Sequence, residues 1–257
     1  MTHPRFLAAR HAGGALIELM VGLTIGLMVA LAAMVSVSHT RQASRTLDAD
    51  VALHQDAATV WRVLGLHLRQ AGARRLQTTA GSTDVAFNAG FKTTTASGAA
   101  GPLDGDASSI TTVSDGDAQA HSASCLGTDG ELDRIESKFS VVDGELRCEG
   151  HNRVRTTDLK KYPDGIKSAD ATGALIAGVQ ALRLRYVQQV GADLQYLDTP
   201  TNWSAVVAVE ACLHLASEPS GEIDAPLTDC AGQEVTPGDG RLHKVFRRVF
   251  QLRNLAR

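Results

Sequence analysis

The chain has 257 residues, of which 44% are hydrophobic and 21% are charged, so it is long enough and apolar enough to bury a core. Lysine and arginine total 25 against 28 aspartates and glutamates, and the resulting charge of −3 removes the overall attraction expected of a dedicated nucleic-acid binder. Aromatic residues make up only 4%, too few for a protein that works mainly by stacking bases or sugars.

The longest apolar run lies near the N-terminus. Residues 19–38 form 20 consecutive positions without a charge, and a helix of that length spans a bilayer core of roughly 30 Å. Arg5 and Arg10 are the only strong charges before Glu18, so the positive-inside rule places the N-terminus in the cytoplasm. We therefore expect a transmembrane segment at about 15–38, with the rest of the chain outside the cytoplasm.

An ordinary secretory signal is the alternative interpretation, with an Ala-x-Ala cut after Ala32. Such a signal has an apolar region of about 7 to 15 residues, which is shorter than this run. It also does not normally carry a carboxylate such as Glu18 at its leading edge. A charge at that depth is costly in lipid and points to a function.

The helix is expected to continue beyond the apolar run, because no proline occurs between Pro4 and Pro102. Gly72 is a plausible end of the helix, with Arg69 in its last turn. Apolar residues at steps of three and four predict that one face of residues 47–68 packs on a core. That face consists of Leu47, Val51, His54, Ala58, Trp61, Leu64 and Leu68.

The rest of the chain predicts loops and antiparallel strands. Residues 77–124 are rich in Thr, Ser, Gly and Asp and indicate loop with one or two short strands, such as 108–114. Asp143-Gly144 between two alternating segments predicts a hairpin. Alternation also predicts strands at 181–190, 205–216 and 241–254, with Leu182, Leu184, Tyr186 and Val190 on one face. The predicted fold class is α+β, a long helix packed on an antiparallel sheet.

Four cysteines, Cys125, Cys148, Cys212 and Cys230, agree with export. None lies in a C-x-x-C pair or has a histidine at zinc-finger spacing, so disulfides are favoured over a zinc site. Four cysteines allow three connectivities. The pairs 125–148 and 212–230 are favoured because each encloses a short segment with turn residues, and free buried thiols are the alternative.

No catalytic or cofactor motif accompanies the nine histidines. We expect no enzymatic activity, no cofactor and no metal ion, and His54 and His67 on the helix are expected to be solvated or half-packed. Asp104 and Asp106 are expected to serve turns rather than calcium. The basic stretch 241–257 could bind DNA, but alternating Leu242, Phe246, Phe250 and Leu252 favour a core strand.

A short basic segment precedes the sequence Gly-Gly-Ala-Leu-Ile-Glu at residues 13–18. This motif resembles the class III signal of type IV prepilins, whose pattern is G-F-T-L-I-E, with Gly14 in place of the usual Phe or Met and Ala15 in place of Thr or Ser. The resemblance implies cleavage between Gly13 and Gly14 by a prepilin peptidase and N-methylation of Gly14. Residues 1–13 would then be the leader, 14–76 the long helix, and 77–257 a β-rich domain outside the cytoplasm.

Six later segments carry a second resemblance, at 66–73, 125–127, 139–150, 173–187, 201–215 and 239–254. Together they resemble the PilW family of minor pilins. The resemblance implies a pilin-like fold and a minor pilin that helps to start assembly near the tip of a type IV pilus. Before assembly it would be anchored in the inner membrane, with its C-terminal domain in the periplasm, and after assembly it would be part of the fibre. Its partners would be the major pilin, other minor pilins and the assembly platform.

The resemblance implies roles for two features of the apolar segment. Glu18 would pair with the free amine of a neighbouring subunit and so neutralise two charges in an apolar bundle. Gly22 and Gly26 form a G-x-x-x-G pair, which permits close approach of helices but also occurs by composition alone in membrane helices. A J-type pseudopilin of type II secretion and a tip subunit that binds a surface or DNA remain the alternatives.

Overall fold

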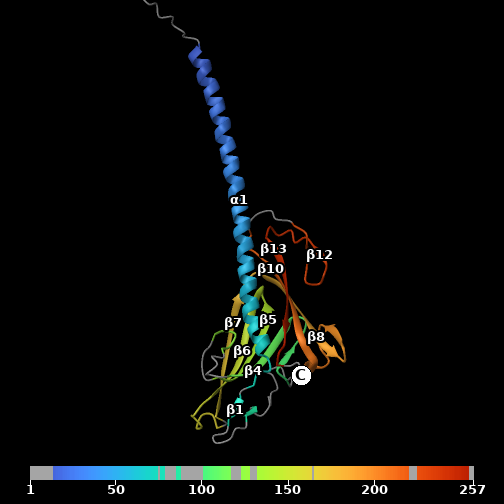
Figure 1. Cartoon of the computed structure of the whole chain (residues 1–257). Coiled ribbons are helices and arrows are strands. Elements are labelled where there is room, and N and C mark those ends of the chain that lie inside the picture. The colour runs from blue at the N-terminus through green and yellow to red at the C-terminus, as the bar shows by residue number, and fades with distance from the viewer. Residues whose placement is uncertain are drawn as a thin grey trace, which may run out of the picture. The chain divides into compact units, whose positions relative to one another are not determined.

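The computed structural model describes residues 14–74, 76–78, 85–87, 101–116, 123–127, 132–163, 165–219 and 225–254. The expected leader, Gly13 included, lies outside these residues. By contact density the chain divides into two compact units, Met1–Asp48 and Ala49–Arg257. The second unit, called the globular unit below, holds the end of the long helix and all the strands that the structure describes (Figure 1).

One helix, α1, runs without a break from Gly14 to Gln70, as the absence of proline predicts. It ends where Gly72 takes the left-handed φ of 78°, as predicted from the sequence; the segment boundary at residue 76 stays a prediction. Backbone hydrogen bonds then tie the chain to a strand, from Gly72 N–H to Val113 O and from Asp115 N–H to Ala73 O, both 2.9 Å. The Asn254 amide donates to the carbonyls of Arg69 and Ala71, which lack partners within the helix.

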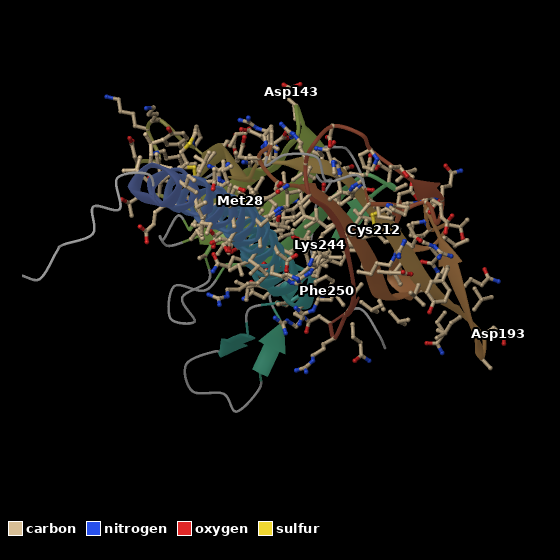
Figure 2. All side chains as sticks on the ribbon, turned by 90° about the horizontal axis from the view of Figure 1, so that it is seen from above. Met28, Asp143, Asp193, Cys212, Lys244 and Phe250 are labelled. Atoms are coloured by element: carbon tan, nitrogen blue, oxygen red, sulfur yellow. A yellow bond between two sulfur atoms is a disulfide. The ribbon has the colours of Figure 1, made fainter. Side chains whose placement is uncertain are left out.

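Five strands form the larger antiparallel sheet, in the order β3-β4-β5-β6-β7. Its strands are β3 Leu103–Gly105, β4 Ser109–Asp115, β5 Leu132–Val142, β6 Glu145–Arg155 and β7 Ile166–Ile176. The hairpin predicted at Asp143-Gly144 is confirmed, and both residues have positive φ, 52° and 75°, as a tight turn of this kind requires. Figure 2 shows Asp143 at the outer end of this hairpin.

Four strands form a second antiparallel sheet, in the order β13-β10-β8-β9. Its strands are β8 Val179–Val190, β9 Asp193–Leu197, β10 Val206–Ala216 and β13 His243–Gln251. A short 3-10 helix, Trp203–Ala205, precedes β10. Two small pairs, β1 Leu76–Thr78 with β2 Val85–Phe87 and β11 Leu227–Thr228 with β12 Glu234–Val235, complete the described strands.

One core joins the end of α1 to both sheets. Leu64 and Leu68 of the helix, Phe139 of β5 and Leu213 of β10 belong to the same buried cluster. Tyr186 links the sheets by donating its hydroxyl toward the carbonyls of Asp106 and Ser109, at 3.0 and 3.2 Å. The α+β class, with a long helix packed on antiparallel strands, is therefore confirmed.

The buried face of the helix differs from the predicted one at its beginning. Leu47 and Val51 remain 66% and 54% exposed, and the core stripe starts at Leu53 instead. His54 and Ala58 of the predicted face are also exposed, and the prediction holds at Trp61, Leu64 and Leu68. The buried positions of the helix are Leu53, Ala57, Val60, Trp61, Leu64, Gly65, His67 and Leu68.

Most of the smaller predictions for the strands hold. Phe250 and Leu252 are buried and Leu242 and Phe246 pack against the same core, so the basic C-terminal stretch contains a core strand. Val190 lies exposed at the end of β8, beyond the core that buries Leu182 and Leu184. Asp106 accepts the backbone N–H groups of Ser108 and Ser109, which confirms its turn role.

Candidate functional site

The apolar part of α1 presents its side chains outward on every side. Its large apolar residues are exposed within the chain, up to 72% at Met28. By length and composition, Leu16–Gln70 is the helix among the described residues that could cross a membrane. A helix that is apolar all round requires a lipid bilayer or other helices around it, because water contact would cost roughly 25 cal/mol per Å².

Two hydroxyl groups inside this apolar segment are satisfied within the helix itself. The Thr24 hydroxyl donates to Val21 O at 2.9 Å, and the Ser38 hydroxyl donates to Val35 O at 2.7 Å. These bonds remove donors that would otherwise be unpaired in an apolar surrounding. Both residues are therefore compatible with lipid or with a packed helix bundle.

Glu18 lies near the start of α1, and its side chain is exposed. Gly14 is the first residue of the helix, so four residues of regular helix separate it from the carboxylate. The helix places Glu18 at the leading end of the apolar surface, next to exposed Ile17 and Leu19. A carboxylate in that position needs a cationic partner once the surface around it is dry.

Gly22 and Gly26 lie one helical turn apart, so they share a face of α1. Apart from the adjoining residues and the backbone of the helix itself, no atom of the described residues lies within 4 Å of the position that a Cβ would take at either glycine. Neither glycine is therefore needed to make room for another described part of this chain. A second helix could approach closely at this face.

Both disulfides lie in the globular unit, and their pairing is the one favoured from the sequence. Cys125 is bonded to Cys148 of β6, with Cα atoms 6.4 Å apart, and Cys212 of β10 is bonded to Cys230, with Cα atoms 5.6 Å apart. Figure 2 labels Cys212 on its strand. Each bond fixes a loop to a central strand and so stiffens the unit that the helix carries.

An ion pair ties the helix to the last strand of the globular unit. Asp50 of α1 pairs with the Lys244 ammonium of β13, and the same ammonium lies 3.2 Å from His54 Nε2. The hydrogen bond from Lys244 holds the pKa of Asp50 below its usual value. The sequence did not reveal this contact, because the two residues lie far apart in the chain.

The two helix histidines have different surroundings. His54 is exposed and contacts the edge of the Phe246 ring, in line with the expectation. His67 is only 3% exposed and packs near the Phe139 ring, so the expectation of a solvated or half-packed side chain is wrong. Burial lowers the pKa of His67 to about 4, and the ring is neutral near pH 7.

A second pair of histidines links β10 to β13 and was missed from the sequence. His214 Nε2 and His243 Nδ1 are 3.0 Å apart, and His243 Nε2 lies 2.9 Å from an Asp239 carboxylate oxygen. In the neutral form of His243, donation from its Nε2 to Asp239 leaves Nδ1 to accept from His214. Burial lowers the pKa of His214, and the neighbouring His243 lowers it further. Across the described residues, no group of three or more His, Cys, Asp or Glu side chains is arranged to hold a metal ion.

Comparisons with known proteins found similarity at the level of structure. No protein-family model and no curated protein matches the sequence. A type IV-like pilin from Thermus thermophilus is similar with a TM-score of 0.45 and 17% identity, over 79% of this chain and 98% of that chain. A chain of the GspK-GspI-GspJ complex from the type 2 secretion system of enterotoxigenic Escherichia coli is similar with a TM-score of 0.32 and 12% identity, over 75% of this chain and 96% of that chain.

Proposed function

We propose that this chain is a pilin-class assembly subunit, and specifically a minor pilin of the PilW type that helps to start a type IV pilus. The observation that carries the proposal is the exposed apolar surface of α1, which bears a single carboxylate, Glu18, at its leading end. The same helix continues into a disulfide-bonded globular unit. A helix of this kind can anchor the subunit in a membrane and then pack in a bundle of similar helices.

The physical task of such a subunit is to leave the membrane without exposing its apolar segment to water. Exposure of about 20 apolar residues would cost tens of kcal/mol at roughly 25 cal/mol per Å². Packing against other helices keeps that surface dry in both states. The open face at Gly22 and Gly26 would allow the closest approach.

Glu18 would supply the electrostatic part of assembly. Cleavage after Gly13 by a prepilin peptidase would create an amine on Gly14, which methylation would leave basic. The Glu18 carboxylate of one subunit would pair with this amine on a neighbour, since a buried charge without a partner is strongly unfavourable. The subunit would thus wait in the inner membrane with its globular unit in the periplasm, and it would be carried into the fibre by the assembly platform, beside other minor pilins and the major pilin.

Replacement of Glu18 by alanine tests this role. Glu18→Ala should leave membrane insertion and processing intact, because removal of a charge makes the segment easier to accommodate in lipid. The variant should accumulate in the inner membrane and enter pili poorly, with fewer fibres if this subunit is needed for initiation. The measurement compares processed protein in membranes with protein in sheared pili, in one strain background.

Asp48→Ala is the matched control, because it removes one exposed carboxylate from the same helix outside the apolar run. This control should enter pili at the wild-type level. Wild-type incorporation of Glu18→Ala would show that the carboxylate is dispensable. Wild-type protein that is processed but absent from sheared pili would favour a secretion pseudopilin instead.

A further inference from the structure

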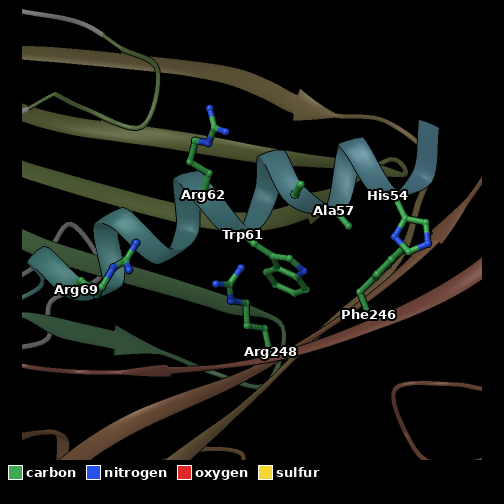
Figure 3. Close-up of a pocket in the computed structure, with 8 residues that line it drawn as sticks. His54, Ala57, Trp61, Arg62, Arg69, Phe246 and Arg248 are labelled. Atoms are coloured by element: carbon green, nitrogen blue, oxygen red, sulfur yellow. The ribbon is translucent and has the colours of Figure 1, made fainter. Parts of the chain in front are cut away.

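A shallow groove of about 420 Å³ lies between α1 and β13, within the globular unit (Figure 3). The helix forms one wall of the groove and β13 forms the other. Its lining residues are His54, Ala57, Ala58, Trp61, Arg62, Arg69, Phe246 and Arg248.

The groove carries a local excess of positive charge. Arg62, Arg69 and Arg248 line it, and none of its lining residues is acidic. The contacts of these arginines are with neutral groups: Arg69 Nε donates to the Gly65 carbonyl at 2.9 Å, and the Arg248 guanidinium lies 5.6 Å from the centre of the Phe250 ring. Among the described residues, none of the three has an ion pair with a carboxylate. The nearby Asp50 carboxylate is engaged by Lys244. The groove therefore favours an anionic partner.

The floor of the groove is apolar, so a matching partner carries an apolar group as well as negative charge. Exposed Ala58 and half-buried Phe246 offer aliphatic and aromatic surface beside the guanidinium groups, whereas Ala57 is buried. Trp61 is only 8% exposed and packs against Phe250, with ring centroids 5.8 Å apart, so little of its ring is free to stack. A nucleic acid would use phosphate contacts and broad stacking platforms, and the buried Trp61 does not supply one. An acidic peptide with an apolar side chain uses both the charge and the floor.

We propose that the groove binds an acidic segment of a partner protein, in which carboxylates flank an apolar side chain that sits on Ala58 and Phe246. The carboxylates would pair with Arg62 and Arg248 from the two walls. The proposal rests on the proposed function, because an assembly subunit meets other proteins in the fibre. It extends that function by giving the chemistry of one such partner.

The test measures binding to the purified full-length chain in detergent micelles, so its result does not depend on fibre formation or on Glu18. The probe is a short fluorescein-labelled peptide of alternating glutamate and leucine, followed by fluorescence anisotropy. A peptide with glutamine in place of glutamate and a single-stranded oligothymidine serve as comparison probes. We expect the glutamate peptide to bind, with affinity that falls as salt is raised, and the other two probes to bind at least tenfold more weakly.

A matched pair of variants at Ala58 locates the site, since this exposed helix position lines the groove and tolerates glutamate and lysine with little loss of helix propensity. Ala58→Glu places a carboxylate among the arginines and should weaken binding of the glutamate peptide roughly tenfold, whereas Ala58→Lys should bind it at least as well as the wild type. The double variant Arg62→Gln/Arg248→Gln should also lose binding. Equal affinity of Ala58→Glu and wild type, equal binding of the glutamine peptide, tighter binding of oligothymidine, or no binding of the glutamate peptide would each overturn the proposal.

Discussion

His67 should make the globular unit less stable in mild acid. Its ring is 3% exposed, and burial lowers its pKa from 6.5 to about 4. In the unfolded chain the ring takes up a proton as the pH falls through 6.5, whereas in the folded chain it stays neutral down to about 4. The unfolded state therefore binds more protons in this interval, and stability is lost as the pH falls.

The size of this effect follows from the shift. A group with these two pKa values lowers the free energy of unfolding by roughly 2.5 kcal/mol between pH 7.5 and pH 4.5. Other groups titrate in the same interval, so the effect of His67 is best measured as a difference between two proteins. His67→Leu keeps an apolar side chain against Phe139 and removes the titration.

The assay is urea unfolding of the full-length chain in micelles, followed by the fluorescence of Trp61 and Trp203, both in the globular unit. Wild type should lose roughly 2.5 kcal/mol more than His67→Leu on going from pH 7.5 to pH 4.5. The same loss in both proteins would refute the reasoning, because it would mean that His67 is protonated in the folded state as easily as in the unfolded state.

Two further predictions concern packing and covalent links. Gly65→Ala should destabilise the globular unit by about 1–3 kcal/mol in urea unfolding, because the new Cβ would lie 2.6 Å from Cε1 of buried Phe250. Gly22→Ala should leave the stability of that unit unchanged, because among the described residues only its own helix lies within 4 Å of the new Cβ. Unaltered stability of Gly65→Ala would contradict the packing described. Nonreducing peptide mapping should recover the 125–148 and 212–230 links, each of which contributes roughly 3 kcal/mol, and thiols that alkylate without reduction would count against them.

Local patterns predicted much of the fold. Asp143-Gly144 identified the β5–β6 hairpin because that pair accepts the positive φ of a tight turn. Alternation found β8, β10 and β13, and Gly72 marked the end of α1. Each of these signals consists of residues that are close together in the chain, so it can be recognised in a single sequence.

Features that depend on distant contacts were missed or placed wrongly. Alternation predicts antiparallel pairing, but it does not say that the strands divide between two sheets. The helix face was predicted from Leu47 onward because apolar spacing alone does not tell which turn first meets the core, which is the turn of Leu53. His67 is buried because Phe139 of β5 packs beside it, and the pair of His214 with His243 depends on strand register.

The apolar segment of α1 also combines features that are present in the sequence with features that only the structure shows. Its length, its lack of charge and the position of Glu18 are properties of the sequence, and the structure adds that the surface is exposed and that Gly22 and Gly26 face open space. The groove beside Arg62 and Arg248 had no signal in the sequence, because its walls come from opposite ends of the chain.

The intact mass of the protein extracted from membranes tests the central claim most directly. Processing as a prepilin removes residues 1–13, including Arg5 and Arg10, and so takes the formal charge from −3 to −5. The account predicts a mass that begins at Gly14, increased by one methyl group if the amine is methylated. A protein that begins after Ala32 would instead have lost most of its apolar segment and Glu18 to an ordinary signal peptidase, and would contradict the proposal that this chain is a pilin-class subunit.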